Sequence, residues 1–154
     1  SRLQHVSRGT PWDLSKFWAG AAVSVFQKQL AARTMWQECR GEPEDGQRAV
    51  AHVIVNRVKD GRWGKTLATV CMWGHQFSGW NAGDANRIPS CLLADEDPLI
   101  VKFIQMLNEA LTDPDPTFDA THYYATSMKT PPFWAVGQTP TAQIGRHRFF
   151  AGIK

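Results

Sequence analysis

The stretch that decides the fold reads Glu38-Cys-Arg-Gly-Glu-Pro-Glu-Asp-Gly-Gln-Arg-Ala-Val-Ala-His-Val-Ile-Val-Asn-Arg-Val58. Its first residues end a helical pattern, because Gly41 can take the left-handed conformation that closes a helix at no steric cost. Pro43 then suits the first position of a new helix, and acidic residues and an apolar stripe of about four turns follow it. The stretch therefore predicts two helices joined by a tight corner, with Glu38 at the end of the first.

Helical patterns continue on both sides of this corner. The preceding pattern begins at Ser15, a good N-cap, and runs to about Arg40 as one helix or two. A short helix is expected over residues 67–73, followed by a long loop over residues 74–90 that is rich in Gly, Asn and Ser. Residues 97–116 open with Asp-Pro and close with Asp-Pro-Asp-Pro, which predicts a well-bounded helix between them.

The remaining segments predict little regular structure. Residues 1–13 carry turn signals and indicate an irregular arm. The segment from Phe118 onward is rich in aromatic residues and prolines, so we expect loops and at most a short hairpin. The fold class is therefore mainly α, in a single domain.

Composition narrows the class of protein. The chain has 154 residues, with 17 Lys and Arg against 14 Asp and Glu and a net charge of +3. A chain of this length buries about 70% of its unfolded surface and can build a core without metal or disulfide staples. The aromatic fraction of 11% excludes intrinsic disorder, and the mild charge does not fit a dedicated nucleic-acid binder.

The cysteines and histidines indicate no metal or redox chemistry. Cys39, Cys71 and Cys91 cannot all pair within one chain, and no CxxC spacing occurs. We expect free thiols and a reducing compartment, with no cofactor and no metal. The longest nearly apolar stretch, residues 17–26, is too short to span a bilayer, and residues 1–6 lack the apolar core of a signal peptide.

Glu38 is the strongest candidate for a chemical role. At the end of a helix it meets the negative end of the helix dipole, and it follows the apolar pair Met35-Trp36. Both features favour the neutral acid, and glycosidic cleavage needs an acid that protonates the leaving sugar oxygen. Spacing alone leaves open that Glu38 is an ordinary solvated glutamate at a helix end.

Residues 38–58 closely resemble the signature of the SleB/CwlJ-type cell-wall hydrolases, which include spore-cortex-lytic enzymes and phage endolysins. That pattern runs E-A-R-G-E-P and then G-Q-x-A-V-A-x-V-I-x-N-R-V. Residues 76–78, 120–124 and 144–149 match further family motifs in the same order. The resemblance covers about residues 31–151, which is most of the chain.

The resemblance implies a peptidoglycan-cleaving domain with a mainly α, lysozyme-like fold of the goose-type lysozyme or lytic transglycosylase kind. In the family, the first glutamate of the signature is the catalytic acid, and here that position is Glu38. The domain organisation that follows is an arm and first helix over residues 1–27, within the same domain as a catalytic part over residues 28–154. Cys39 departs from the usual alanine, which places a thiol beside the acid.

The matching motifs also suggest residues that contact substrate. We expect a saccharide groove to be lined by Gln76, Phe77, Ser78, His122, Tyr123 and Tyr124. Aromatic rings stack on sugar faces while amides and hydroxyls bind sugar hydroxyls, and a tyrosine hydroxyl could orient Glu38. Two alternatives stay open: Phe77 is a core residue, and residues 122–124 form a short half-buried strand.

The chemical outcome depends on a second carboxylate. A lytic transglycosylase cleaves the β-1,4 bond between N-acetylmuramic acid and N-acetylglucosamine with one carboxyl, and it leaves a 1,6-anhydro end. A hydrolytic muramidase needs a second carboxylate, for which Glu42 and Asp84 are candidates. Capping chemistry gives Glu42 another role, as an acid at the start of the following helix. We favour the transglycosylase and keep the muramidase and a non-catalytic peptidoglycan-binding module as alternatives.

The biological setting follows from the resemblance. We expect a phage endolysin that is made in the host cytoplasm without a signal peptide and acts on periplasmic peptidoglycan after release. Its partners are then peptidoglycan glycan strands, with no nucleic acid and no stable membrane insertion, and the chain acts as a monomer.

Overall fold

The computed structural model describes residues 25–72 and 77–154, so the predicted arm and the start of the first helix at Ser15 lie outside the described residues. In chain order the elements are α2 (Val25–Cys39), α3 (Glu44–Asp60), α4 (Leu67–Met72), η2 (Ser78–Trp80), α5 (Arg87–Leu92), α6 (Pro98–Glu109), β1 (His122–Ala125), η3 (Phe133–Ala135), β2 (Ala142–Ile144) and β3 (His147–Phe150). Helices form most of this architecture, as the sequence predicts.

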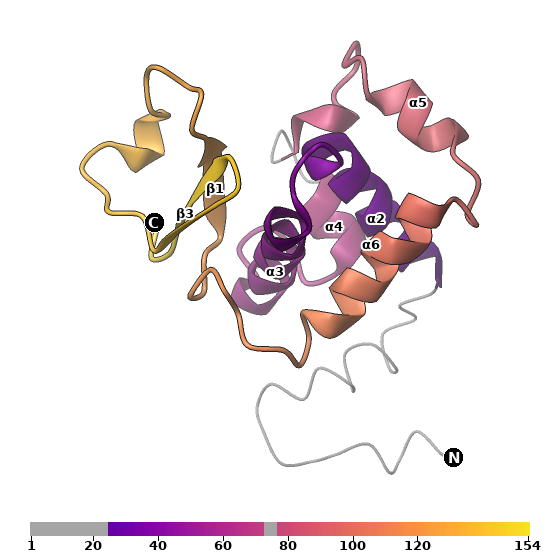
Figure 1. The fold of residues 1–154 in the computed structure, drawn as a ribbon, viewed down its shortest axis with the longest axis horizontal. Coiled ribbons are helices and arrows are strands. Elements are labelled where there is room, and N and C mark those ends of the chain that lie inside the picture. Colours follow the sequence, from indigo (N-terminus) through magenta and orange to yellow (C-terminus); the bar gives the residue numbers. More distant parts are fainter. Residues whose placement is uncertain (1–24, 73–76) are drawn as a thin grey trace.

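The helices pack around one main core, and α3 lies between this core and the sheet (Figure 1). On the α2 side, Met35, Ile54 and Phe103 are fully buried together. On the sheet side, Val53 packs against Phe149 in a second cluster. Helix α3 therefore packs against the helical core on one side and against the sheet on the other.

The corner after α2 forms where it is expected, but Pro43 precedes the first helical residue, Glu44, and Gly41 does not close α2 as predicted. Helix α3 follows Pro43, carries acids in its first turn and ends at Gly61, whose φ is +83°. Gly41, in contrast, is not among the glycines with positive φ. A hydrogen bond of 2.9 Å from the Glu42 amide to the Cys39 carbonyl closes this turn instead, so the left-handed cap predicted at Gly41 is wrong.

Tertiary contacts add structure where a loop is expected. Residues 78–80 and 87–92 are helical, although they fall in or overlap the predicted loop. The amide of Gln37 donates to the Ser90 hydroxyl at 2.9 Å, and Arg33 Nε donates to the Ser90 carbonyl at 3.0 Å. Side chains of α2 thus hold this segment, which local sequence does not reveal.

The other helices follow their sequence signals closely. Asp97 caps α6, and its side chain accepts a hydrogen bond of 2.9 Å from the Leu99 amide. Helix α4 covers residues 67–72 of the expected short helix. Helix α6 ends at Glu109, four residues before the Asp-Pro-Asp-Pro stretch.

The C-terminal part forms a three-stranded antiparallel sheet in the order β1-β3-β2, where a hairpin at most was expected. His122 pairs with Phe150, and Ile144 pairs with His147. Besides the hairpin of β2 and β3, the sheet contains β1, which includes the aromatic run at residues 122–124. The alternative that this run forms a short strand is therefore confirmed. Strand β1 pairs with a strand more than twenty residues away, which short-range pattern does not predict.

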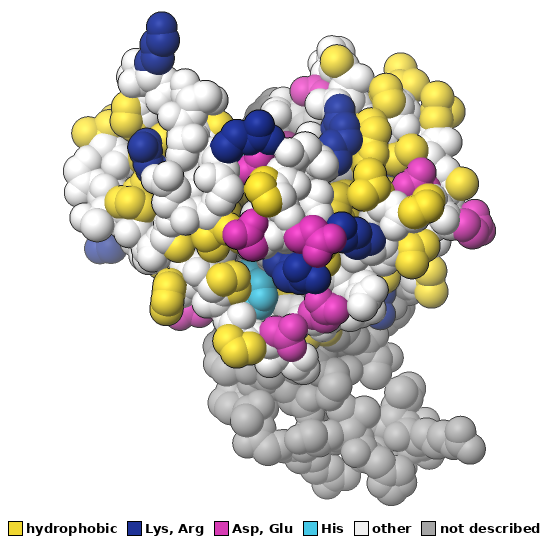
Figure 2. Space-filling model, in the orientation of Figure 1, with side chains coloured by type: hydrophobic (Ala, Val, Ile, Leu, Met, Phe, Trp, Pro, Cys, Tyr) yellow, Lys and Arg dark blue, Asp and Glu magenta, His cyan; other side chains and the backbone are white. Residues whose placement is uncertain are grey.

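The outer surface gives no direct indication of a site. On the face in Figure 2, acidic and basic side chains are interspersed, and apolar side chains gather over the α5 and α6 side. On these two helices, the exposed large apolar side chains are Ile88, Leu92 and Val101. Within the described residues, no helix has the length and apolar character needed to cross a membrane.

Candidate active site

Glu38 lies in the last turn of α2 and meets the sheet through one short hydrogen bond. The hydroxyl of Tyr123, on β1, donates to Glu38 Oε1 at 2.8 Å. Burial raises the pKa of Glu38, and the negative charge of Asp84 adds to this effect. The Tyr123 hydrogen bond and the positive charge of Arg57 oppose it, but the pKa stays above its ordinary value. Glu38 is thus a half-buried acid that can hold a proton more readily than a solvated glutamate.

Tyr123 is held by packing against two rings of the neighbouring strand β3. Its ring contacts those of His147 and Phe149, with centroids 4.8 and 5.6 Å away. Burial and the nearby Glu38 raise its pKa well above the ordinary value. The hydroxyl therefore remains a proton donor toward Glu38, which agrees with the expectation that a tyrosine orients this acid.

Arg57 is a neighbour of this pair on α3, in the stretch predicted as an apolar stripe, and it was not among the predicted site residues. It is 5% exposed, and its Nε donates to the Thr121 carbonyl at 2.6 Å. Its guanidinium lies 5.0 Å from the ring centroids of both Trp63 and Phe77. The signal was available, because a charged residue in the apolar stripe of a helix is rarely buried without a specific reason.

A pocket of about 540 Å³ adjoins Tyr123. It is lined by Arg57, Arg62, Trp63, His122, Tyr123, Trp134 and Lys154. The His122 ring lies 5.4 Å from Trp63 and 4.8 Å from Trp134, measured between centroids. Burial, together with the charges of two arginines, lowers the pKa of His122 to about 4, so it is neutral near pH 7. The pocket therefore combines aromatic walls with positive charge.

Sequence reasoning found only two of these lining residues as site candidates, His122 and Tyr123. It missed Trp63 and Trp134, since tryptophans are scattered along the chain and only the fold shows which ones share a pocket. Trp134 belongs to η3, a short 3-10 helix in the segment between β1 and β2.

The other predicted groove residues have different positions. Gln76 lies outside the described residues. Phe77 is 2% exposed and belongs to the main core, so the prediction that its ring faces substrate is wrong for this structure. Ser78 is exposed at the start of η2. Tyr124 stacks on Phe150 at 5.5 Å and is not among the residues that line the pocket.

Of the two candidate second carboxylates, Glu42 is bound to Arg146 in a contact that joins two parts of the fold. Its side chain is 6% exposed, and its two oxygens accept hydrogen bonds of 2.8 Å from the backbone amide and the Nε of Arg146. Burial acts to raise its pKa, but these hydrogen bonds and nearby positive charges outweigh it and lower the pKa. Glu42 is therefore an ionised anchor for the turn between β2 and β3, and it does not cap α3 as the alternative supposed.

Asp84 is better situated to act with Glu38. It is half-buried in the loop between η2 and α5, and its Oδ1 accepts a hydrogen bond of 2.8 Å from the Asn86 amide. Its negative charge raises the pKa of Glu38, although less than burial does.

The cysteines are free, and the thiol beside Glu38 is shielded. Cys39 and Cys71 are buried, whereas Cys91 is exposed. The Cys39 thiol donates to the Met35 carbonyl at 3.2 Å, and burial raises its pKa. Oxidation needs an accessible thiolate, so this environment protects the thiol beside Glu38 from oxidation. Among the described residues, no group of three or more His, Cys, Asp and Glu side chains could hold a metal ion.

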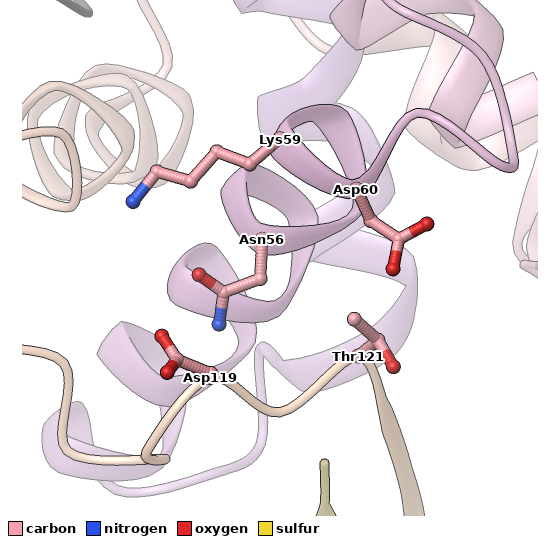
Figure 3. A pocket seen from close by; sticks show the side chains of 5 residues that line it. All are labelled: Asn56, Lys59, Asp60, Asp119 and Thr121. Atoms are coloured by element: carbon pink, nitrogen blue, oxygen red, sulfur yellow. The ribbon is translucent and has the colours of Figure 1, made fainter. Parts of the chain in front are cut away.

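A second pocket, of about 400 Å³, lies at the end of α3 (Figure 3). It is lined by Asn56, Lys59, Asp60, Asp119 and Thr121. Glu38 lines neither pocket, but only the first is lined by aromatic rings and by Tyr123, the hydrogen-bond partner of Glu38. The pocket beside Tyr123 is therefore the better candidate for a sugar-binding site.

The acid at the end of α2 and the aromatic pocket lined by its partner Tyr123 fit the class expected from the sequence, that of the cell-wall hydrolases. The comparison with protein families agrees, since the model described as Cell Wall Hydrolase matches residues 41–150. The chain belongs to this family. Glu38 lies three residues before the matched range, so its role depends on its own geometry.

Named relatives and solved structures support the same assignment. The chain is 28% identical over 125 residues to the spore cortex-lytic enzyme of Bacillus subtilis, and 29% identical over 121 residues to that of Oceanobacillus iheyensis. Each match covers 79% of this chain but only 36% and 40% of the relatives' lengths. The crystal structure of the catalytic domain of the Bacillus cereus SleB protein matches with a TM-score of 0.68 and 27% identity, covering 83% of this chain and 91% of that one.

A further structure supports the fold alone. The catalytic domain of the germination-specific lytic transglycosylase SleB from Bacillus anthracis matches with a TM-score of 0.66 at 24% identity. The match covers 86% of this chain and all of that one. The predicted mainly α, lysozyme-like fold is thereby confirmed.

Proposed function

We propose that this chain cleaves the β-1,4 bond between N-acetylmuramic acid and N-acetylglucosamine in peptidoglycan as a lytic transglycosylase, with Glu38 as acid and then base. The observation that carries the proposal is the hydrogen bond of 2.8 Å from Tyr123 to a Glu38 carboxyl whose pKa is raised. Membership of the Cell Wall Hydrolase family and the similarity to spore cortex-lytic enzymes support cleavage of a cell-wall polymer.

In the first step, the protonated Glu38 gives its proton to the glycosidic oxygen as the bond to C1 of the muramoyl residue breaks. Positive charge develops at C1 while Glu38 becomes an anion. The Tyr123 hydroxyl and the Arg57 charge both favour that anion, because they lower the pKa of Glu38. They therefore help proton release while burial favours initial protonation.

In the second step, the Glu38 carboxylate takes the proton of the muramoyl C6 hydroxyl, whose oxygen forms a bond to C1. The product ends in a 1,6-anhydro ring, and Glu38 is protonated again. Each turnover needs only one carboxyl, which fits the commitment of Glu42 to Arg146. No water enters the product.

A hydrolytic muramidase is the second candidate, and the position of Asp84 favours it. A carboxylate whose charge acts on Glu38 could activate water at C1. A non-catalytic peptidoglycan-binding module is the third candidate. A binding module requires the aromatic pocket but does not require an acid with a raised pKa.

Digestion of purified peptidoglycan followed by mass spectrometry separates these candidates. We expect fragments with 1,6-anhydro ends from the wild type, whereas a muramidase leaves ends that are one water heavier and reducible. Glu38→Gln should lower fragment release by about 10²–10⁴-fold, because general acid catalysis contributes that much.

Glu44→Gln is a matched control for the digestion. Glu44 is an exposed acid in the first turn of α3, paired with Arg48 and Lys102. This variant should digest peptidoglycan like the wild type. Undiminished release by a folded Glu38→Gln variant would reject Glu38 as the acid, and binding without any release by the wild type would identify a binding module.

We also propose that the chain acts as a monomeric endolysin, made in the cytoplasm of a bacteriophage host and active on periplasmic peptidoglycan after release. The resemblance to a family that includes phage endolysins supports this setting. Cytoplasmic expression should leave cells intact until the inner membrane is permeabilised, and lysis should follow within minutes. Lysis without permeabilisation would contradict the proposal.

A further inference from the structure

The pocket beside Tyr123 has a pronounced charge asymmetry. Arg57, Arg62 and Lys154 line it, and no acidic side chain is among its lining residues. Arg57 is buried in the wall, whereas the other two cations are exposed at its edge. A pocket with several positive charges attracts an anion, and a partly buried charge is screened less by salt than one on an open surface.

The aromatic side chains limit the shape of the ligand. The Trp63 ring lies beneath the Arg62 guanidinium at 4.4 Å, and His122 lies between Trp63 and Trp134. Trp63 is only 8% exposed and lies beside both Arg62 and Arg57, so the rings open to a pyranose are those of the half-buried His122 and Trp134. The pocket thus offers ring walls for a sugar and cations for a negatively charged substituent.

We propose that this pocket is a subsite for a carboxylate attached to an N-acetylated sugar of the glycan strand, held by Arg62 and Lys154 with Arg57 as a buried supporting charge. The identity of the ligand rests on the proposed function. In peptidoglycan, two sources carry this chemistry: the stem peptide and an unsubstituted lactyl group of muramic acid.

Asp60 limits the strength of this subsite. It accepts hydrogen bonds from Arg62 Nε at 2.7 Å and from Nη2 at 3.1 Å. The carboxylate of Asp60 therefore competes with an incoming anion for the same guanidinium. Removing the Asp60 charge should release Arg62 toward the pocket and strengthen anion binding.

The pocket in Figure 3 provides an internal contrast. It lies on the same end of α3, but Asp60 and Asp119 line it together with one cation, Lys59. Two carboxylates there disfavour an anion. Loss of Lys59 changes the net charge by the same amount as loss of Arg62, but in the other pocket.

Calorimetric titration in a Glu38→Gln background tests the subsite without turnover. The ligands are a disaccharide muropeptide with free stem carboxylates, the same muropeptide with its carboxyls amidated, and the peptide-free disaccharide with a free lactyl carboxylate. We expect a carboxylate-bearing ligand to bind about 10-fold tighter than the amidated one, as for a charged hydrogen bond in a partly exposed site. Comparison of the two carboxylate-bearing ligands identifies the source.

Charge variants give effects of opposite sign, which a structural role would not produce. Arg62→Gln and Lys154→Gln should remove the preference for the carboxylate, Asp60→Asn should increase it, and Lys59→Gln should leave it unchanged. These positions are exposed or half-buried, so folding should persist, and circular dichroism checks this.

Equal affinity for all three ligands, or the same loss in Lys59→Gln as in Arg62→Gln, would overturn the subsite. This failure is distinct from failure of the proposed function. The latter is read from fragment release by the protein with Glu38 intact, which does not depend on carboxylate preference.

Discussion

At the scale of single residues, effects of opposite sign set the pKa of Glu38. Burial raises its pKa, while the Tyr123 hydroxyl and the Arg57 charge lower it. An acid that must first give and then take a proton needs a pKa between the extremes of a solvated and an isolated buried carboxyl. The three side chains come from α2, β1 and α3, so the balance depends on how these elements meet.

Tyr123→Phe tests this balance. The hydroxyl favours the ionised form of Glu38, so its loss should raise the pKa of Glu38 further. Activity that needs the protonated acid falls as pH rises through this pKa, and its alkaline limb should therefore move to higher pH. We also expect kcat to fall by about 10-fold or more, since a charged hydrogen bond is lost. The pH profile of fragment release measures both effects.

Tyr124→Phe is the matched control, because this hydroxyl lies near Arg148 and its ring stacks on Phe150. Its profile should keep the wild-type alkaline limb. A Tyr123→Phe profile shifted to lower pH would show that the hydroxyl does not stabilise the Glu38 anion.

At the scale of elements, the turn between β2 and β3 holds the corner between α2 and α3. Arg146 donates to both oxygens of Glu42 and, through Nη2, to the Gly41 carbonyl at 2.7 Å. Gly145 has a φ of +57°, and a Cβ there would lie 2.9 Å from Glu42 Oε1. Glycine is therefore required at this close approach. The contact joins the sheet that carries Tyr123 to the corner just after Glu38.

Glu42→Gln should weaken this junction and destabilise the fold by about 1 kcal/mol, a modest value because Arg146 is largely exposed to solvent. The folded-state pKa of Glu42 is lowered, so its contribution is present above the unfolded pKa, near 4.3, and is lost as pH falls through the folded value. Urea unfolding at neutral and at acidic pH should show the difference from wild type shrinking in acid.

Glu44→Gln should have a much smaller effect, because the exposed pairs of Glu44 with Arg48 and Lys102 join surface side chains. Equal destabilisation by the two variants at neutral pH would contradict the anchoring role of Glu42.

At the scale of the whole molecule, three histidines make the fold sensitive to acid. His52, His122 and His147 are largely buried, and burial lowers the pKa of each. The unfolded chain therefore binds protons at a higher pH than the folded one. The contribution of these histidines to stability is present above the unfolded pKa, near 6.5, and is lost as pH falls toward the folded values.

We expect the melting temperature to fall between pH 7 and pH 5. His122 contributes because its folded pKa is about 4, so a folded His122→Asn variant should lose less stability than the wild type over the same interval. Calorimetry at the two pH values measures this. An identical drop in both proteins would show that His122 does not contribute to acid sensitivity.

Much of the site could be expected from local sequence. Glu38 stands at the end of a helix, just before a corner that the sequence predicts, and Tyr123 lies in a matched aromatic motif. The partners from other elements could not be expected in the same way. Phe77 illustrates the reason, because an aromatic residue in a loop looks the same in sequence whether its ring faces a groove or the core.

The resemblance to a known family singled out the candidate acid, whereas local sequence by itself determined the mainly α class, the corner between α2 and α3 and the start of α6. These features depend on residues within a few turns of one another, and short-range physics controls them. Only the tertiary structure decided that β1 joins β3, that Tyr123 reaches Glu38, and that Trp63 and Trp134 share a pocket. Such contacts join residues far apart in the chain, and they form only when the complete core brings their elements together.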